Sequence, residues 1–433
     1  MNYNETIDYL FSSLPTFQRE GAVAYKPGLE RISEFCRKIG NPQRNYFIIH
    51  VAGTNGKGSV SSMLAAVLQQ AGYQTGLFTS PHLSDFRERI RVNGEMISKQ
   101  KVVNFVDKYR RAMEECGLSF FEMTAAMAFD YFAQSDVEVA IVETGLGGRL
   151  DATNIVLPLV SVITNIGLEH TEFLGDSLPK IAREKGGIIK KCVPVILGER
   201  NPNCCLVFEE IAADMRSELI YAPEAFTLES STMDGRLQQF NIRRMRDGYL
   251  YSLRTDLQGE YQRQNIVTVC AVADYLHENT PLTISRRALV EGLRSAAEIT
   301  SLRGRWQQIC ARPLTVCDTG HNAHGIAFVA EQLRHRTTSG RLYCVMGFCG
   351  DKNIDDMLAL LPADAHYIFT HADMRRAAAP EDVARLAAAR GLSHEVAPTV
   401  ASALARAHEL LTDDDMLFIG GSTFIVAEAL DAE

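Results

Sequence analysis

The chain has 433 residues, more than one hydrophobic core usually serves, so two domains are expected and a third is possible. Hydrophobic residues make up 46% of the chain and charged residues 22%, as in an ordinary globular protein. The formal net charge of −9 argues against general binding of nucleic acid, which needs a basic surface, but it leaves room for a local basic pocket that binds a small anion.

Cysteine usage and the lack of targeting signals bear on the cellular compartment. The ten cysteines include no C-x-x-C pair and are mostly scattered through apolar runs, so buried reduced thiols are expected. The N-terminal residues lack the basic start and apolar stretch of a signal peptide, and no segment approaches the roughly 18 apolar residues that span a bilayer. We therefore expect a cytoplasmic protein with no membrane partner.

The first clear element is a predicted buried strand at residues 46–49, followed by a glycine-rich turn and a helix with apolar residues at helical spacing. Such a turn brings backbone N–H groups and a helix N-terminus to a phosphate, whereas a glycine turn that binds nothing has no need of a lysine and a hydroxyl there. Lys57 is expected at the β- and γ-phosphates of a bound nucleotide and Ser59 at a magnesium ion, although Gly58 between them departs from the pattern G-x-x-x-x-G-K-[ST]. The candidate nucleotide-binding residues of this turn are Gly53, Thr54, Asn55, Gly56, Lys57, Gly58 and Ser59.

The later elements predict an α/β fold with two sheets. Strand-like runs at residues 137–142, 159–164 and 193–197 alternate with helical patterns, which predicts a doubly wound, mostly parallel sheet with nucleotide at the carboxyl ends of its strands. Residues 221–257 alternate polar and apolar residues and are expected to form antiparallel strands appended to that sheet. A second series of strands, at residues 314–318, 342–346, 367–370 and 416–420, predicts a smaller Rossmann-like α/β domain. The predicted domains are residues 1–297 and 298–433, with a hinge near Ile299.

Several polar residues follow predicted strands or end helices and are candidates for chemistry. Glu143 closes the strand at 137–142, where a carboxylate opposite a phosphate loop would hold magnesium, or else cap the amide of Gly145. His170 follows the strand at 159–164, and on sequence alone a packing or capping role competes with metal ligation. Lys185 ends a predicted helix, where a cation is favourable with the helix dipole whether or not it has another role.

Three ordered blocks resemble one family. The pattern Gly53-Thr54-x-Gly56-Lys57-x-Ser59 resembles the nucleotide loop of the Mur ligase superfamily. Residues 50–59, 79–94 and 143–154 are each similar to the branch that contains the folylpolyglutamate synthases and dihydrofolate synthases. Further similarities extend the resemblance through most of the chain.

The resemblance implies a metal site and a modified lysine. In the family a serine, a glutamate and a histidine at the positions of Ser80, Glu143 and His170 bind magnesium. Ser59 is expected to bind magnesium as well, and two magnesium ions are expected in all. The segment at residues 183–188 resembles a motif whose lysine, here Lys185, is carbamylated and so becomes a carboxylate able to orient metal and water. The family usually has alanine where this chain has Gly186.

The resemblance also implies ATP contacts in both domains. Asn265 aligns with a residue that contacts the adenine side of ATP, although a buried asparagine near a helix start can be a cap. Arg305 resembles an arginine that reaches ATP from the second domain, where Arg303 replaces the usual proline. Asp318 and His321 match the pattern Asp-Gly-Ala-His-Asn, from which Thr319-Gly320 departs; Asp318 is expected to bind ATP and His321 to be catalytic.

In family members that also make dihydrofolate, two stretches line a dihydropteroate pocket. A helix start with an aromatic pair packed in the core explains the first stretch equally well. The candidate residues for substrate binding are Ser119, Phe120, Phe121, Glu122, Leu150, Asp151 and Ala152.

The expected function is ATP-dependent ligation of L-glutamate to the carboxylate of folates, and of dihydropteroate as well, through an acyl phosphate. The catalytic candidates are Lys57, Glu143, His170, Lys185 and His321, with Arg305 and Asp318 completing the site on domain closure. The expected partners are small molecules and the expected state is a monomer. The alternatives are a folylpolyglutamate synthase only, another Mur-type amino-acid ligase, or a P-loop NTPase switch without ligase activity.

Overall fold

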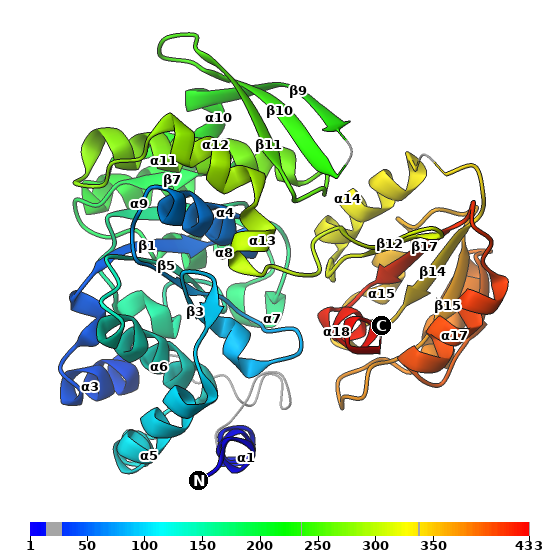
Figure 1. The fold of residues 1–433 in the computed structure, drawn as a ribbon, viewed down its shortest axis with the longest axis horizontal. Coiled ribbons are helices and arrows are strands. Elements are labelled where there is room, and N and C mark those ends of the chain that lie inside the picture. The colour runs from blue at the N-terminus through cyan, green and yellow to red at the C-terminus, as the bar shows by residue number, and fades with distance from the viewer. Residues whose placement is uncertain (14–27, 235, 337, 433) are drawn as a thin grey trace. The chain divides into compact units, whose positions relative to one another are not determined.

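The computed structural model describes residues 1–13, 28–234, 236–336 and 338–432 (Figure 1). The chain divides into two compact units, Met1–Asp256 with Gln262–Leu302, and Leu257–Tyr261 with Arg303–Glu433. The second unit therefore includes a short segment, Leu257–Tyr261, that is both preceded and followed in the chain by residues of the first unit. The predicted domain boundary between residues 297 and 298 stays a prediction.

The first unit is built on a sheet of eight described strands. The strand order is β4-β3-β2-β5-β1-β6-β7-β8, parallel from β2 to β8 and antiparallel at β3 and β4. The strands are β1 (Phe47–Ala52), β2 (Thr75–Phe78), β3 (Ile90–Val92), β4 (Glu95–Met96), β5 (Val139–Glu143), β6 (Val160–Ile163), β7 (Val195–Leu197) and β8 (Leu219–Tyr221). The central strands are apolar and buried along almost their whole length, as expected of parallel strands covered on both faces.

Helices cover both faces of this sheet. On one face, α3, α5 and α6 pack with Ile48, Ala140 and Val142 in one core, while α4 lies on the other face against β1, β2 and β5 (Figure 1). A second core includes β6, β7, α8 and α9. The helices of this unit are α1 (Tyr3–Ser13), α3 (Glu30–Lys38), α4 (Lys57–Gln70), α5 (Lys99–Cys116), α6 (Phe120–Gln134), α7 (Thr171–Leu174), α8 (Leu178–Gly186), α9 (Cys205–Met215), α10 (Ala222–Ala225), α11 (Gln262–Asn279), α12 (Arg286–Arg294) and α13 (Ala296–Thr300).

Strands β9 (Phe226–Asp234), β10 (Leu237–Arg244) and β11 (Leu250–Thr255) form a separate antiparallel sheet. The prediction that these strands are appended to the first sheet is therefore wrong. Alternate residues of β10 and β11 are buried, and Phe240 and Leu253 among them are fully buried. A sheet with one apolar face must be covered by another layer. Helices α11 and α12 supply that layer, so the strands pack face-on instead of extending the edge beyond β8 (Figure 1).

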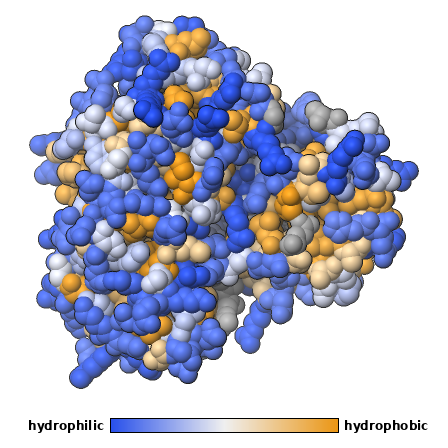
Figure 2. Space-filling model, in the orientation of Figure 1, coloured by the Kyte–Doolittle hydropathy of each residue, from blue (hydrophilic) through white to orange (hydrophobic). Residues whose placement is uncertain are grey.

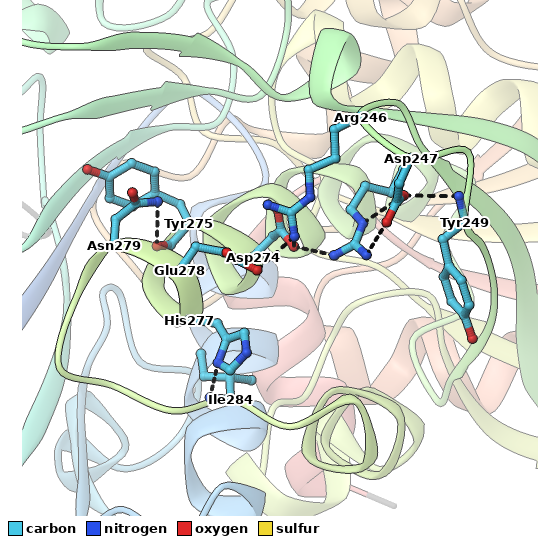
Figure 3. A network of polar contacts seen from close by, with 10 residues as sticks. Arg246, Asp247, Tyr249, Asp274, Tyr275, His277, Glu278, Asn279 and Ile284 are labelled. Carbon is cyan, nitrogen blue, oxygen red and sulfur yellow. Dashed lines mark hydrogen bonds and ion pairs between the residues drawn. The ribbon is translucent and has the colours of Figure 1, made fainter.

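Charged groups tie this small sheet to α11 (Figure 3). Asp274 accepts hydrogen bonds from Arg244 at 2.8 Å and from Arg246 at 3.2 Å, and Arg246 also binds Glu278 at 2.8 Å. Arg244 binds Asp247 in the turn between β10 and β11. Arg244 at the end of β10 and Arg246 in the turn therefore link the β10–β11 hairpin to α11.

The second unit contains a six-stranded sheet among the described residues. Its order is β12-β13-β17-β14-β15-β16, parallel except for β12. Its elements are β12 (Gln307–Ala311), β13 (Leu314–Cys317), α14 (Ala323–Arg334), β14 (Leu342–Met346), α15 (Ile354–Leu358), β15 (His366–Phe369), α16 (Pro380–Ala389), β16 (Ser393–Val396), α17 (Val400–Leu410), β17 (Met416–Gly420) and α18 (Thr423–Ala432). The predicted fold class, two α/β units with mostly parallel sheets, is confirmed.

Two expectations from composition can be compared with the structure. All ten cysteines are free, and five are buried, but Cys192 and Cys310 are exposed, so the prediction of buried thiols is wrong for these two. Cys192 lies in a turn with a positive φ of 59°, and Cys310 lies on the edge strand β12. None of the described helices combines the length and apolarity needed to cross a membrane. Hydrophilic residues cover most of the face seen in Figure 2, with hydrophobic residues scattered among them.

Candidate active site

The predicted phosphate loop connects β1 to α4, and two of its glycines have no room for a side chain. Gly56 is the N-cap of α4 with a left-handed φ of 83°, and Gly53 has a φ of 152°. A Cβ at Gly53 would collide with the hydroxyl of Thr164, and one at Gly56 with the side chain of Asn265. The backbone of the loop therefore runs against its neighbours at a distance that only glycine allows.

Residues after β6 hold the loop in place. The backbone N–H of Thr54 donates to the carbonyl of Asn165 at 3.0 Å, and that of Asn55 donates to the Asn165 side chain at 2.8 Å. The Thr54 hydroxyl donates to the carbonyl of Gly167 at 3.1 Å and accepts from its N–H at 2.9 Å. These four hydrogen bonds hold Thr54 and Asn55 of the loop against the segment that follows β6.

Two lysine amines meet at one backbone oxygen of this loop. Lys57 Nζ donates to the carbonyls of Gly53 at 3.0 Å and Thr54 at 3.3 Å, and Lys185 Nζ donates to the same Gly53 carbonyl at 2.8 Å. Burial, together with the nearby charge of Lys57, lowers the pKa of Lys185 to about 7, against the opposing effects of Glu169 and Asp151. The site therefore contains one buried lysine that is readily deprotonated beside a second, partly buried one.

The strand register brings the other candidates to the same edge of the sheet. Glu143, the last residue of β5, pairs with Val51 of β1, directly before the loop. Neighbouring β2 ends two residues before Ser80, and β6 ends seven residues before His170. Because all four strands are parallel, Ser80, Glu143, the loop and His170 all follow carboxyl ends of adjacent strands, where ligands bind in such sheets.

Glu143 and His170 differ in their surroundings. Glu143 is buried close to Arg89, and burial lowers the pKa of Arg89 to about 10 against the opposing charges of Glu143 and Glu88. His170 has a positive φ of 49° at the start of α7, and its Nε2 lies 3.8 Å from Glu169 Oε1. The amide of Gly145 donates to Asp151, so the alternative that Glu143 caps this amide is not supported.

The first candidate substrate stretch forms a helix start. Ser119 is the N-cap of α6: its hydroxyl accepts from the N–H of Glu122 at 3.3 Å, and the Glu122 carboxylate accepts from the N–H of Ser119 at 2.8 Å. Glu122 also pairs with Arg31 at 3.2 Å. The ring of Phe120 stacks on that of Phe11 with centroids 4.9 Å apart, and Phe121 lies against Gly145. These contacts favour the structural role for Ser119 and Glu122.

The second stretch organises the glycine turn after β5. Asp151 accepts from the amides of Gly145 at 2.8 Å, Leu146 at 2.9 Å and Thr153 at 3.0 Å, and from the Thr153 hydroxyl at 2.5 Å. Burial raises the pKa of its carboxyl, and these hydrogen bonds oppose the rise. Ala152 is buried and Leu150 is half-buried. The roles of both stretches in binding substrate stay predictions.

The candidates of the second unit gather at the end of β13. Asp318 accepts from the Tyr261 hydroxyl at 2.5 Å and from the amides of Trp306 at 2.8 Å and Gly320 at 2.7 Å, while burial raises the pKa of its carboxyl. Arg305 donates to the Thr319 hydroxyl. His321 Nδ1 donates to the Thr319 carbonyl at 3.0 Å.

Comparison with known proteins places the chain in a family. Residues 51–273 match the Mur ligase middle domain and residues 304–423 the Mur ligase glutamate ligase domain. The dihydrofolate synthase/folylpolyglutamate synthase of Bacillus subtilis is 35% identical over 83% of this chain and 84% of its own length. The chain belongs to the folylpolyglutamate synthase/dihydrofolate synthase family of Mur ligases. The predicted family is confirmed.

Solved structures of this family have the same fold. A structure described as Escherichia coli FolC in complex with DHPP and ADP has a TM-score of 0.88 and 28% identity, covering 100% of this chain and 97% of that chain. A bifunctional folylpolyglutamate synthase/dihydrofolate synthase from Yersinia pestis, complexed with AMPPNP and Mn ion, has a TM-score of 0.86 and 28% identity, covering 100% and 98%. The chain spans about half the length of a probable bifunctional folylpolyglutamate synthase/dihydropteroate synthase of Haloferax volcanii, to which it is 33% identical over 99% of its own residues.

The donor set of this folylpolyglutamate synthase relative suits magnesium that is shared with a nucleotide. Within the described residues no group of three or more His, Cys, Asp or Glu side chains is placed to hold a metal ion. Magnesium is usually bound by one or two carboxylates together with phosphates and water, so it does not need such a group. Ser59, Ser80, Glu143 and His170 offer oxygen and nitrogen donors at one sheet edge, and their metal roles stay predictions.

Sequence reasoning missed three residues of this candidate site. Asn165 holds the loop and is the second residue after β6. Glu143 was selected as a polar residue at the end of a buried strand, and the same rule could have found Asn165. Glu169 lies close enough to Lys185 to raise its pKa. Gln262 contacts Ser59 from α11, and no local signal distinguishes it from an ordinary helix-start residue.

Proposed function

We propose that this chain is an ATP-dependent ligase that joins L-glutamate to the carboxylate of folates, and to that of dihydropteroate as well. The observation that carries the proposal is the meeting of Lys57 and Lys185 at the Gly53 carbonyl, on the same sheet edge as Glu143. The relative from Bacillus subtilis bears this pair of activities in its name. We also propose that the protein is a monomer and acts in the cytoplasm.

The chemistry solves a leaving-group problem. A carboxylate does not react with an amine, because an oxide ion would have to leave. Attack of the substrate carboxylate on the γ-phosphorus of ATP releases ADP and forms an acyl phosphate, which the amine of glutamate attacks to give the amide, phosphate and a proton. The enzyme contributes charge neutralisation and positioning.

The catalytic candidates of the first unit bind either phosphate or metal in this scheme. The loop amides and Lys57 neutralise the β- and γ-phosphates. Bound magnesium would supply further positive charge at the transferred phosphoryl group, with Ser59, Ser80, Glu143, His170 and modified Lys185 as its protein contacts. On this proposal Asn265 contacts the adenine side, and Arg305, Asp318 and His321 act from the second domain.

We also propose that Lys185 is carbamylated. A neutral lysine amine adds to carbon dioxide, which forms an N–C bond and releases one proton. The burial of Lys185 and its pKa of about 7 favour the neutral amine this reaction needs. Enzyme equilibrated with ¹³C-labelled bicarbonate should show one carbamate resonance that is lost in Lys185→Arg. A wild-type spectrum identical to that of Lys185→Arg would reject the modification.

Product analysis tests the function. Purified enzyme with ATP, magnesium and L-glutamate should convert both tetrahydrofolate and dihydropteroate to products one glutamate heavier, with one ADP per bond. Lys57→Ala should lower turnover at least about a hundredfold, the size expected for an electrostatic contact to the transition state. Lys191→Ala, which removes an exposed lysine, is the matched control and should keep full turnover.

The outcomes separate the alternatives. Turnover of tetrahydrofolate alone would leave a folylpolyglutamate synthase only. If neither substrate is converted but a different carboxylate acceptor is, the chain is another Mur-type ligase. ATP hydrolysis that is independent of any acceptor would support an NTPase switch. Normal turnover by well-folded Lys57→Ala would overturn the phosphate-loop assignment.

A further inference from the structure

Helix α11 begins with a buried glutamine that contacts the phosphate loop from outside. Gln262 is fully buried, and its Nε2 donates to the hydroxyl oxygen of Ser59 in the first turn of α4 at 3.2 Å. The other end of its amide is also held: Asn265 Nδ2 donates to Gln262 Oε1 at 2.8 Å. Ser59 is 1% exposed and Asn265 5%, so the three side chains form a buried chain of hydrogen bonds between the two helix starts.

The direction of these bonds is set by Asn265. Because Gln262 Oε1 accepts from Asn265, its NH₂ group faces Ser59 and can only donate to it. A serine hydroxyl has two lone pairs and one proton. One lone pair of Ser59 therefore accepts from Gln262, which leaves one lone pair and the proton for groups inside the loop.

We infer that Gln262 is a positioning residue for Ser59. It holds the hydroxyl in the rotation in which the remaining lone pair is available to a divalent cation and the proton to a phosphate oxygen of the nucleotide. This inference rests on the proposed function only in assuming that the loop binds a magnesium nucleotide. Gln262 itself touches neither the nucleotide nor the metal.

A role in packing alone does not explain the choice of glutamine. A leucine would fill a similar volume without burying an amide, and burial of an amide is unfavourable unless its groups are hydrogen-bonded. Both ends of the Gln262 amide make hydrogen bonds, and its NH₂ group donates to the Ser59 hydroxyl, the group expected to contact the ligand of the loop. Gln264 is exposed, so the first turn of α11 contains a buried and an exposed glutamine two residues apart.

The test is a double-mutant cycle read as nucleotide affinity, which needs no folate and no glutamate. Binding of ADP with Mg²⁺ is measured by calorimetry for wild type, Gln262→Ala, Ser59→Ala and the double variant. Loss of one hydrogen bond that orients a ligand contact should weaken ADP binding roughly three- to tenfold in Gln262→Ala. In the Ser59→Ala background the same change should have no further effect, because the hydroxyl on which Gln262 acts is gone.

Two further variants separate positioning from structure. Gln262→Glu keeps the volume but turns the donor into a carboxylate that captures the Ser59 proton and repels phosphate, so it should weaken ADP binding more than Gln262→Ala. Gln264→Ala, the matched control in the same helical turn, should bind ADP like wild type. Equal losses from Gln262→Ala in both Ser59 backgrounds, or a lower melting temperature with unchanged ADP affinity, would overturn the inference. Failure of the ligase assay with a normal cycle would instead count against the proposed function alone.

Discussion

Two carboxylates beside one glycine turn have different tasks, and the difference lies in their hydrogen bonds. Asp151 uses both oxygens on the amides of the turn and on Thr153, so its removal would release buried N–H groups. Glu143 ends the strand instead and faces the charge of Arg89. A loss of dihydropteroate activity in Asp151→Ala would therefore report on the turn as much as on a pterin contact. Phe121, which is only partly buried, is a better position from which to probe the predicted pocket.

His50, on β1 next to the phosphate loop, makes stability depend on pH. It is fully buried, its Nε2 lies 2.8 Å from the Thr153 hydroxyl, and burial, with a smaller effect of Lys190, lowers its pKa from 6.5 to about 3. Above pH 6.5 the ring is neutral in both the folded and unfolded states. Between pH 6.5 and about 3 only the unfolded state takes up the proton, so the free energy of unfolding falls as pH falls, by up to about 1.4 kcal/mol per pH unit.

His50→Gln should reduce this dependence, because the amide can still donate to Thr153 but does not titrate. Between pH 7 and pH 5, wild type should lose up to about 2 kcal/mol more of its free energy of unfolding than the variant does. Urea unfolding at the two pH values measures the difference. Parallel losses in both proteins would show that His50 is not held neutral in the folded state.

The candidate site could be predicted from sequence to the extent that it follows strand ends. Glu143, Ser80 and His170 each follow a short apolar run, and the parallel register brings those run ends together. Gln262 could not be found this way, because it reaches Ser59 across 203 positions of sequence and lies on a helix. Its contact depends on how α11 packs on α4, which no local pattern contains.

At the scale of elements, burial decides which strands are visible in the sequence. The central strands β1, β5, β14 and β17 are apolar along nearly their whole length and were predicted. The edge strands β12 and β16 are mostly half-buried or exposed and carry no apolar run, so they were missed.

The antiparallel strands β9 to β11 show a different limit. Their alternation of buried and exposed residues predicts strands with one covered face but does not say what covers it. The covering layer is formed by α11 and α12, which come later in the chain. Hydrogen bonds from Arg244 and Arg246 to Asp274 of α11 hold the sheet against it (Figure 3). Pairing partners of sheets are long-range properties, and for this reason the strands were assigned to the wrong sheet.

At the scale of the whole molecule, the segment Leu257–Tyr261 belongs to the second unit although the chain on both sides of it belongs to the first. Gln332 of α14 binds this segment twice, at the N–H of Glu260 and the carbonyl of Gln258. Tyr261 donates to the buried Asp318. The next residue, Gln262, is bound to Ser59 of the first unit. Adjacent residues of one chain are thus anchored in different units.

This arrangement makes a prediction that is specific to one unit. Tyr261→Phe removes the hydroxyl donor to the Asp318 carboxylate and keeps the ring, so it should destabilise the second unit by roughly 1.5–3 kcal/mol, the range for a hydrogen bond to a charged group. Hydrogen exchange followed by mass spectrometry should show faster exchange in β13 and β14, while β1 and β5 of the first unit keep their protection.

Tyr343→Phe is the matched control, because the Tyr343 hydroxyl on β14 makes no hydrogen bond with other described residues of the unit. It should leave the exchange of both sheets as in wild type. Faster exchange in both units of Tyr261→Phe would mean that they open as one cooperative body, because loss of a contact within the second unit would then lower the protection of the first. Unchanged exchange in β13 would show that the amides of Trp306 and Gly320 suffice to hold Asp318, and that residues 257–261 are an accessory to the second unit instead of a part of its fold.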